Sequence, residues 1–252
     1  MQLTPWYGDS PIIELDGDPS AIGGPTIRQR RRLVEVLGTF TDDQWNHPSR
    51  CDGWSNRDVV THLQSTNQFW SFSIAMGLKG EPTQFLATFD PVASPAQLVA
   101  DAPAVGTAEL LDQFAASTEA LAAQLGSLDD AGRRATAEAP VGHVSISALA
   151  HHAIWDSLVH ERDILLPLGL APTEVDAETI ASLRYAAALS PAFAVSRAET
   201  PGGTHVLAVE PTDADAFRVQ VTDHVAIETG AADGQPDLCL EIGRAHVCTP
   251  VT

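Results

Sequence analysis

A short segment of the chain, residues 151–163, concentrates histidines and carboxylates at helical spacing. Asp156 and His160 are four positions apart, so on a helix their side chains stack one turn above the other. A carboxylate and an imidazole in this arrangement can bind one divalent cation, by the same geometry as the two histidines of an H-E-x-x-H motif. His152 and Asp163 fall on the same stripe, which apolar residues border. Buried charges need partners or a metal ion, so the stripe is a candidate metal site.

One helix supplies two ligands, so a third must come from elsewhere, and His62 is the best candidate. It lies in the second turn of a helix predicted to begin after Ser55, beside the apolar Leu63, and should face the core. Three protein ligands leave a fourth position open, as in reactive zinc sites. The residues alone leave an alternative open, in which His62 is a core histidine bonded to a backbone carbonyl and Asp156 and His160 form a plain ion pair.

Four long helices in the first 170 residues are predicted to position these side chains. Apolar residues recur at helical spacing between capping residues and terminal glycine or proline over 25–37, 55–76, 107–125 and 145–166. Residues 41–44 and 55–58 both match the capping-box pattern, which opens a helix. The long Pro- and Ala-rich connection over 81–103 is predicted as a loop. No convincing strand separates the helices, so the sequence favours a four-helix bundle.

The sequence pattern changes after Pro172. One further helix is predicted over 176–189, and 205–209 and 217–221 alternate as short strands do. We therefore expect a mainly α protein with an N-terminal arm (1–20), a metal-binding four-helix bundle (21–170), a small α+β domain (175–240) and a tail (241–252). The tail resembles cloning-adapter sequence, so we expect it to be non-native and the natural C-terminus to be missing.

Composition and charge argue against several classes of partner. The 252 residues include 33 acidic and 14 basic ones, a formal net charge of −19, which repels nucleic acids and anionic membranes. No segment approaches the roughly 18 apolar residues of a membrane span, and the first 20 residues lack a secretory signal pattern. Three cysteines fit a reducing compartment better than a disulfide framework. We expect a cytoplasmic protein without nucleic-acid or membrane partners, and the sequence does not indicate its oligomeric state.

Two segments resemble the signatures of one known family. The stretches TDDQW (41–45) and PSRCDGWSNRDVVTHL (48–63) are similar to the N-terminal signature of the mycothiol-dependent maleylpyruvate isomerase family, which belongs to the DinB-like metal-binding four-helix bundles. The stretch WDSLVHERDI (155–164) resembles the family's second signature. The two signatures are separate and in the expected order, and the resemblance covers about 25–169.

The resemblance implies that His62, Asp156 and His160 bind a divalent metal, with zinc as the expected ion. The family usually has glutamate where this chain has Asp156, so the carboxylate is one methylene shorter, and it could bind the ion more weakly or through water. Asp163 is the candidate partner that orients His160 through its other ring nitrogen. His152 is assigned to a supporting or packing position behind the ligands.

The chemistry implied by the resemblance uses mycothiol, a low-molecular-weight thiol, as cosubstrate. A metal-bound thiol would lose its proton and attack the cis double bond of a small electrophilic acid such as maleylpyruvate. We therefore expect a metal- and thiol-dependent isomerase or transferase, with a metal-dependent hydrolase or a non-catalytic metal-binding regulatory protein as alternatives. Arg50 and Arg57 are candidates to hold the acid substrate. Cys51, in the loop before the His62 helix, is assigned a structural role.

Overall fold

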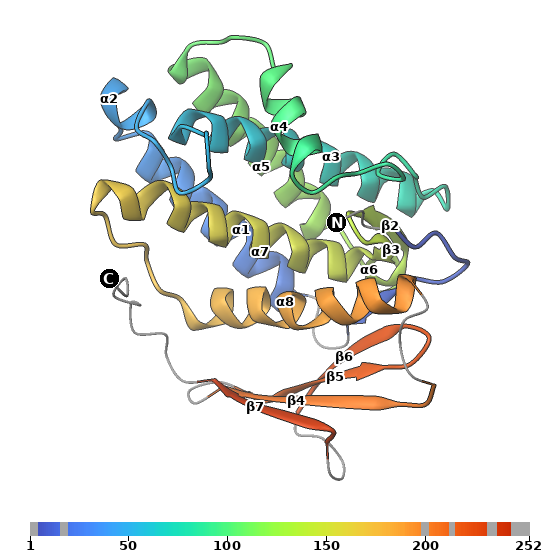
Figure 1. Cartoon of the computed structure of the whole chain (residues 1–252). Coiled ribbons are helices and arrows are strands. Elements are labelled where there is room, and N and C mark those ends of the chain that lie inside the picture. The colour runs from blue at the N-terminus through green and yellow to red at the C-terminus, as the bar shows by residue number, and fades with distance from the viewer. Residues whose placement is uncertain (1–4, 16–19, 198–201, 212–214, 231–235, 243–252) are drawn as a thin grey trace.

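The computed structural model describes residues 5–15, 20–197, 202–211, 215–230 and 236–242. A helical layer occupies most of the chain and a C-terminal sheet packs beneath it (Figure 1), so the expectation of a mainly α protein is confirmed. The predicted tail falls outside the described residues from position 243 onward. None of the helices in the described part of the chain has the length and apolar character that a bilayer crossing requires.

Four long helices form the helical layer: α1 (Ser20–Leu37), α3 (Asn56–Leu78), α5 (Thr107–Gly126) and α7 (Ile146–Leu165). Helix α1 contacts α5 and α7, and α3 contacts the same two helices. Each long helix therefore packs against two others, and apolar side chains fill the space between them. The predicted ligands lie on α3 and α7, which are in direct contact.

Both predicted capping boxes are present and fix where two helices begin. The Thr41 hydroxyl accepts the Gln44 N–H, and the Gln44 side chain accepts the Thr41 N–H, at the start of α2 (Asp42–Trp45). Ser55 and Asp58 make the same reciprocal pair before α3. Because a capping box satisfies two free amides of the first turn, it defines the helix start and places His62 in the second turn of α3.

Several short elements between the long helices were not predicted. A β-hairpin of β2 (Thr136–Ala139) and β3 (Gly142–Ser145) precedes α7, where the sequence analysis expected no strand. That prediction was wrong because four-residue strands are too short to show a clear alternation. Helix α4 (Ala93–Ala100) interrupts the predicted 81–103 loop, and α6 (Asp130–Arg134) follows α5.

Gly77 follows the predicted helix 55–76 and was expected to end it, but α3 continues to Leu78 and Gly77 packs within the helix. A Cβ added at Gly77 would collide with the backbone carbonyl of Thr136 in β2. The missing side chain therefore lets α3 approach the hairpin closely.

The C-terminal region forms a five-stranded mixed sheet in the order β1–β6–β5–β4–β7. Its strands are β1 (Ile13–Leu15), β4 (His205–Pro211), β5 (Phe217–Val221), β6 (Val225–Thr229) and β7 (Leu238–Ile242). The two predicted strands correspond to β4 and β5, whereas β1 comes from the predicted arm and pairs in parallel with β6. Helix α8 (Asp176–Ser196) lies between the layers and contacts α1 and α7 on one side and β5 and β6 on the other (Figure 1).

A buried polar network joins all four long helices. Arg30 of α1 donates from Nε to Asn67 Oδ1 of α3 over 2.8 Å, and from Nη2 to the Ala153 carbonyl of α7 over 2.7 Å. Asn67 Nδ2 in turn donates to the hydroxyls of Ser117 and Thr118 on α5. These bonds are made in an interior from which water is excluded, so they hold α3 and α7 at a defined separation.

Candidate metal centre

His62, Asp156 and His160 lie together between α3 and α7. Asp156 Oδ1 is 3.6 Å from Nε2 of His62 and 3.6 Å from Nε2 of His160. The possible ligand atoms of the three side chains all lie within 4.8 Å of one another. The imidazole of His62 is buried, with a side-chain exposure of 10%, and the other two side chains are only slightly more exposed. The structure thus brings together the three residues that the sequence analysis selected.

The spacing of these side chains fits a shared cation. A separation of 3.6 Å is longer than an N–H···O hydrogen bond. Two ligands of one tetrahedral zinc ion, each bound at about 2.0 to 2.2 Å, lie about 3.4 Å apart. Asp156 Oδ2 is buried and has no hydrogen-bond partner among the described residues, so it is an acceptor that a cation would satisfy. Two imidazoles and one carboxylate also form a donor set that suits zinc and related divalent ions.

The charges around the site favour an additional positive charge. Burial alone would raise the pKa of Asp156, but the imidazoles of His62 and His160 hold it well below its usual range. Burial would likewise lower the pKa of His160, but hydrogen bonds to Asp163 and Cys51 and the charge of Asp156 raise it to about 10. The field that holds a proton on His160 also favours a metal ion, which would have to displace that proton.

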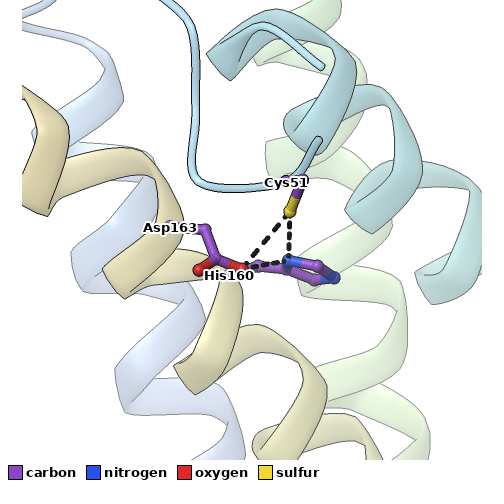
Figure 2. A group of neighbouring side chains, drawn as sticks. All are labelled: Cys51, His160 and Asp163. Carbon is purple, nitrogen blue, oxygen red and sulfur yellow. Dashed lines mark hydrogen bonds and ion pairs between the residues drawn. The ribbon is translucent and has the colours of Figure 1, made fainter. Parts of the chain in front are cut away.

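Asp163 orients His160 (Figure 2). His160 Nδ1 donates to Asp163 Oδ2 over 3.0 Å, which leaves Nε2 facing Asp156. Cys51 Sγ donates to the same carboxylate oxygen over 3.3 Å and lies 3.6 Å from His160 Nδ1. The backbone N–H of Arg50 donates to the Asp163 carbonyl. Asp163 therefore fixes the imidazole and also anchors the loop that leads into α3.

His62 is held in a different way. Its Nδ1 is buried without a hydrogen-bond partner among the described residues. The ring packs against Trp54, with ring centroids 5.5 Å apart, and against His160 at 5.1 Å. Packing, and not a hydrogen bond, therefore sets the orientation of His62.

His152 lies one turn before Asp156 and contacts an aromatic cluster. Its Nδ1 is 2.8 Å from the hydroxyl of Tyr185, and its ring packs on Trp70, Trp155 and Tyr185. Burial lowers the pKa of His152 to about 4, so the ring is neutral near pH 7. The structure thus places His152 behind the three candidate ligands and bonded to α8.

Two basic residues considered for substrate binding lie in different surroundings. Arg50 is exposed, and its Nε is 4.0 Å from Asp163 Oδ1, at the edge of the site. Arg57 instead lines a cavity of about 460 Å³ between α3, α5 and the segment after α4, and donates to the Val105 carbonyl. Arg50 is therefore the better candidate of the two to bind the acid group of a substrate.

Sequence reasoning missed the contacts of Cys51 with Asp163 and His160. No periodicity connects a loop near residue 51 with a helix more than 100 residues later. The only available signal was the position of Cys51 within the first family-like segment.

Comparisons with known proteins identify a family and a shared fold. A family model described as "Mycothiol maleylpyruvate isomerase N-terminal domain" matches residues 27–165. Two similar solved structures are "Crystal structure of the mycothiol-dependent maleylpyruvate isomerase" and a histidine-to-alanine mutant of that enzyme. Each has a TM-score of 0.60 and 15% sequence identity, and the match covers 90% of this chain and 85% of that chain. At this low identity, the structural match shows a shared fold and no more. A search of curated protein sequences gives no match.

Proposed function

The chain belongs to the family of the mycothiol maleylpyruvate isomerase N-terminal domain, and on this premise we propose that it is a metal- and thiol-dependent isomerase or transferase. The observation that carries the proposal is the convergence of His62, Asp156 and His160 within the matched segment. The cosubstrate is mycothiol, and the substrate is a small electrophilic acid such as maleylpyruvate.

The three converging side chains would hold a divalent cation, and zinc suits their donor set. A bound cation supplies positive charge beside an open fourth position, which favours the thiolate form of the cosubstrate. When His160 gives up its Nε2 proton, the hydrogen bond to Asp163 would keep the remaining ring proton on Nδ1, so that the Nε2 lone pair would face the ligand cluster. Trp54 restricts the rotation of His62, whose own Nδ1 makes no hydrogen bond with the described residues.

Thiol-dependent isomerisation requires the protein mainly to hold thiolate and electrophile in contact. The sulfur forms a bond to one carbon of the cis double bond, and the π electrons move onto the conjugated carbonyl oxygen. The former double bond then rotates as a single bond. Loss of the thiolate returns the electrons and leaves the trans isomer. Arg50, exposed on the loop that docks on Asp163, is the candidate to pair with the acid group of the substrate.

The same proposal includes finer assignments of fold and location. We assign residues 21–170 to a DinB-like four-helix bundle that binds the metal, and residues 175–240 to a smaller C-terminal unit. The contact of each long helix with two others supports the bundle assignment. A cytoplasmic location suits a reaction that depends on a reduced thiol.

Turnover by the purified full chain tests the proposal. Maleylpyruvate should convert to its trans isomer only when both mycothiol and a divalent metal are present, and chelation should abolish the conversion. His160→Ala should be inactive, whereas Asp112→Asn, an exposed change on α5, should retain activity. Absence of thiol-dependent turnover by the metal-loaded protein would contradict the isomerase assignment, and metal-dependent hydrolysis without thiol would favour the hydrolase alternative.

A further inference from the structure

A second group of metal-ligating side chains gathers at Nδ1 of the His160 ring (Figure 2), whereas the first trio gathers at Nε2. Asp163 Oδ2 is 3.0 Å from His160 Nδ1 and 3.3 Å from Cys51 Sγ, and the sulfur is 3.6 Å from the same nitrogen. A triangle with these edges has the size expected around one cation bound at about 2.0 Å by nitrogen and oxygen and about 2.3 Å by sulfur. We propose that Cys51, Asp163 and His160 form a second cation site, selective for thiophilic divalent ions such as cadmium, which competes with the first site for His160.

The donor set determines which ions this site would take. Thiolate is a soft ligand and selects thiophilic ions over magnesium or calcium. A thiolate and a carboxylate together carry two negative charges, whereas the trio at Nε2 of the ring carries one, from Asp156. All three side chains are partly buried, so their charges are screened less than surface charges, yet a small ion can reach them.

Binding exchanges protons for the ion. In the structure the Cys51 thiol and the His160 Nδ1–H both donate to Asp163 Oδ2. A cation there forms bonds to sulfur, to Nδ1 and to the carboxylate. The thiol proton passes to solvent, and the Nδ1 proton is lost while Nε2 carries the ring proton. No oxidant or other reactant is needed.

The two sites exclude each other because a neutral imidazole has only one nitrogen lone pair to give. A cation on Nδ1 leaves Nε2 protonated and directed at Asp156 Oδ1, so the first trio keeps only His62 and Asp156. A cation on Nε2 keeps Nδ1–H bonded to Asp163. This exclusion rests on the proposed function of the first site, whereas binding at Cys51 does not.

Cadmium titration of the chelator-treated full chain tests the site through the ultraviolet absorption of the cadmium–thiolate bond. The background protein carries Cys239→Ser and Cys248→Ser, so that Cys51 is the only thiol. One equivalent of cadmium should produce the band in this background and also in His62→Ala, which removes a ligand of the first site only. Cys51→Ser, which keeps a hydroxyl donor for Asp163, should abolish the band and weaken cadmium binding about tenfold or more.

The inference is overturned if the background protein shows no thiolate band at one equivalent, or if the band survives in Cys51→Ser. A second readout leaves Cys51 in place and measures how fast iodoacetamide alkylates its thiol. Cadmium should slow this alkylation, and an unchanged rate also overturns the site. If the cadmium band appears but zinc binding by Cys51→Ser does not depend on His62, the proposed function fails and the cadmium site stands.

Discussion

His160 donates its Nδ1–H to Asp163 Oδ2 over 3.0 Å, and this hydrogen bond determines which ring nitrogen faces Asp156. A neutral imidazole protonated on Nδ1 presents its lone pair on Nε2, where the side chains of His62 and Asp156 converge. The proposed metal centre therefore depends on a carboxylate that does not itself face that centre.

Removing the charge of Asp163 should weaken metal binding while leaving the fold intact. Asp163→Asn should reduce the affinity for zinc about 10- to 100-fold, because the imidazole loses the partner that orients it and increases its basicity. Competition with a chromophoric chelator measures the affinity. Asp112→Asn, on the exposed side of α5, is the matched control and should bind as the wild type does. Equal zinc affinities of the two variants would contradict a role for Asp163 in metal binding.

Metal affinity should rise with pH. His160 has a pKa raised to about 10, so near neutrality it carries a proton on both nitrogens. One of these protons must leave before Nε2 can bind a cation, which predicts an affinity gain of about tenfold per pH unit below that pKa. Zinc binding in a metal buffer between about pH 6 and about pH 8 measures the slope. His224→Gln, in the turn between β5 and β6, should leave the slope unchanged, and a flat profile in the wild type would contradict the prediction.

For metal binding, the negative charge of the Asp156 carboxylate should matter more than the length of the side chain. Asp156→Asn removes the negative charge between the two imidazoles and should lose most of the bound metal. Asp156→Glu keeps the charge and can reach the ion with a small helix shift, so it should retain metal. Metal analysis and circular dichroism of both variants check this result. Full metal content in Asp156→Asn would show that Asp156 is no ligand.

The buried network around Arg30 should contribute strongly to stability. Asn67→Ala leaves the Arg30 Nε, which is inaccessible to solvent, without its acceptor. Breaking a buried charged contact in this way should lower the free energy of unfolding by about 3 kcal/mol or more. Urea unfolding measures the change. Arg31→Gln, one position along the helix and exposed, should have a small effect by comparison; an equally small effect of Asn67→Ala would show that the network is not stabilising.

The elements that position the site could be predicted from sequence because each has a local signal. The capping boxes at Thr41 and Ser55 and the apolar periodicity of the long helices are short-range patterns, and the structure has the helices close to where these patterns place them. The hairpin before α7 and the strand β1 lack such signals. Each has three or four residues, and β1 is stabilised by pairing with β6, more than 200 positions later.

The site residues on α7 could be predicted from the sequence for a similar reason. Asp156, His160 and Asp163 share one helix, so their relative positions follow from helical geometry. The contacts of Cys51 depend on how the loop before α3 packs against α7, through the bond from the Arg50 N–H to the Asp163 carbonyl. No spacing rule encodes that packing, which is why a structural role was the expectation for Cys51.

Metal analysis of the purified protein tests the central claim most directly. Wild-type protein should contain about one divalent ion per chain, as expected for a single three-ligand site. His62→Ala combined with Cys51→Ser, which also removes the proposed second site, should contain far less while keeping the helical circular dichroism of the wild type. If the two proteins hold equal amounts of metal, or if neither binds zinc when it is supplied in excess, His62, Asp156 and His160 do not form a metal centre.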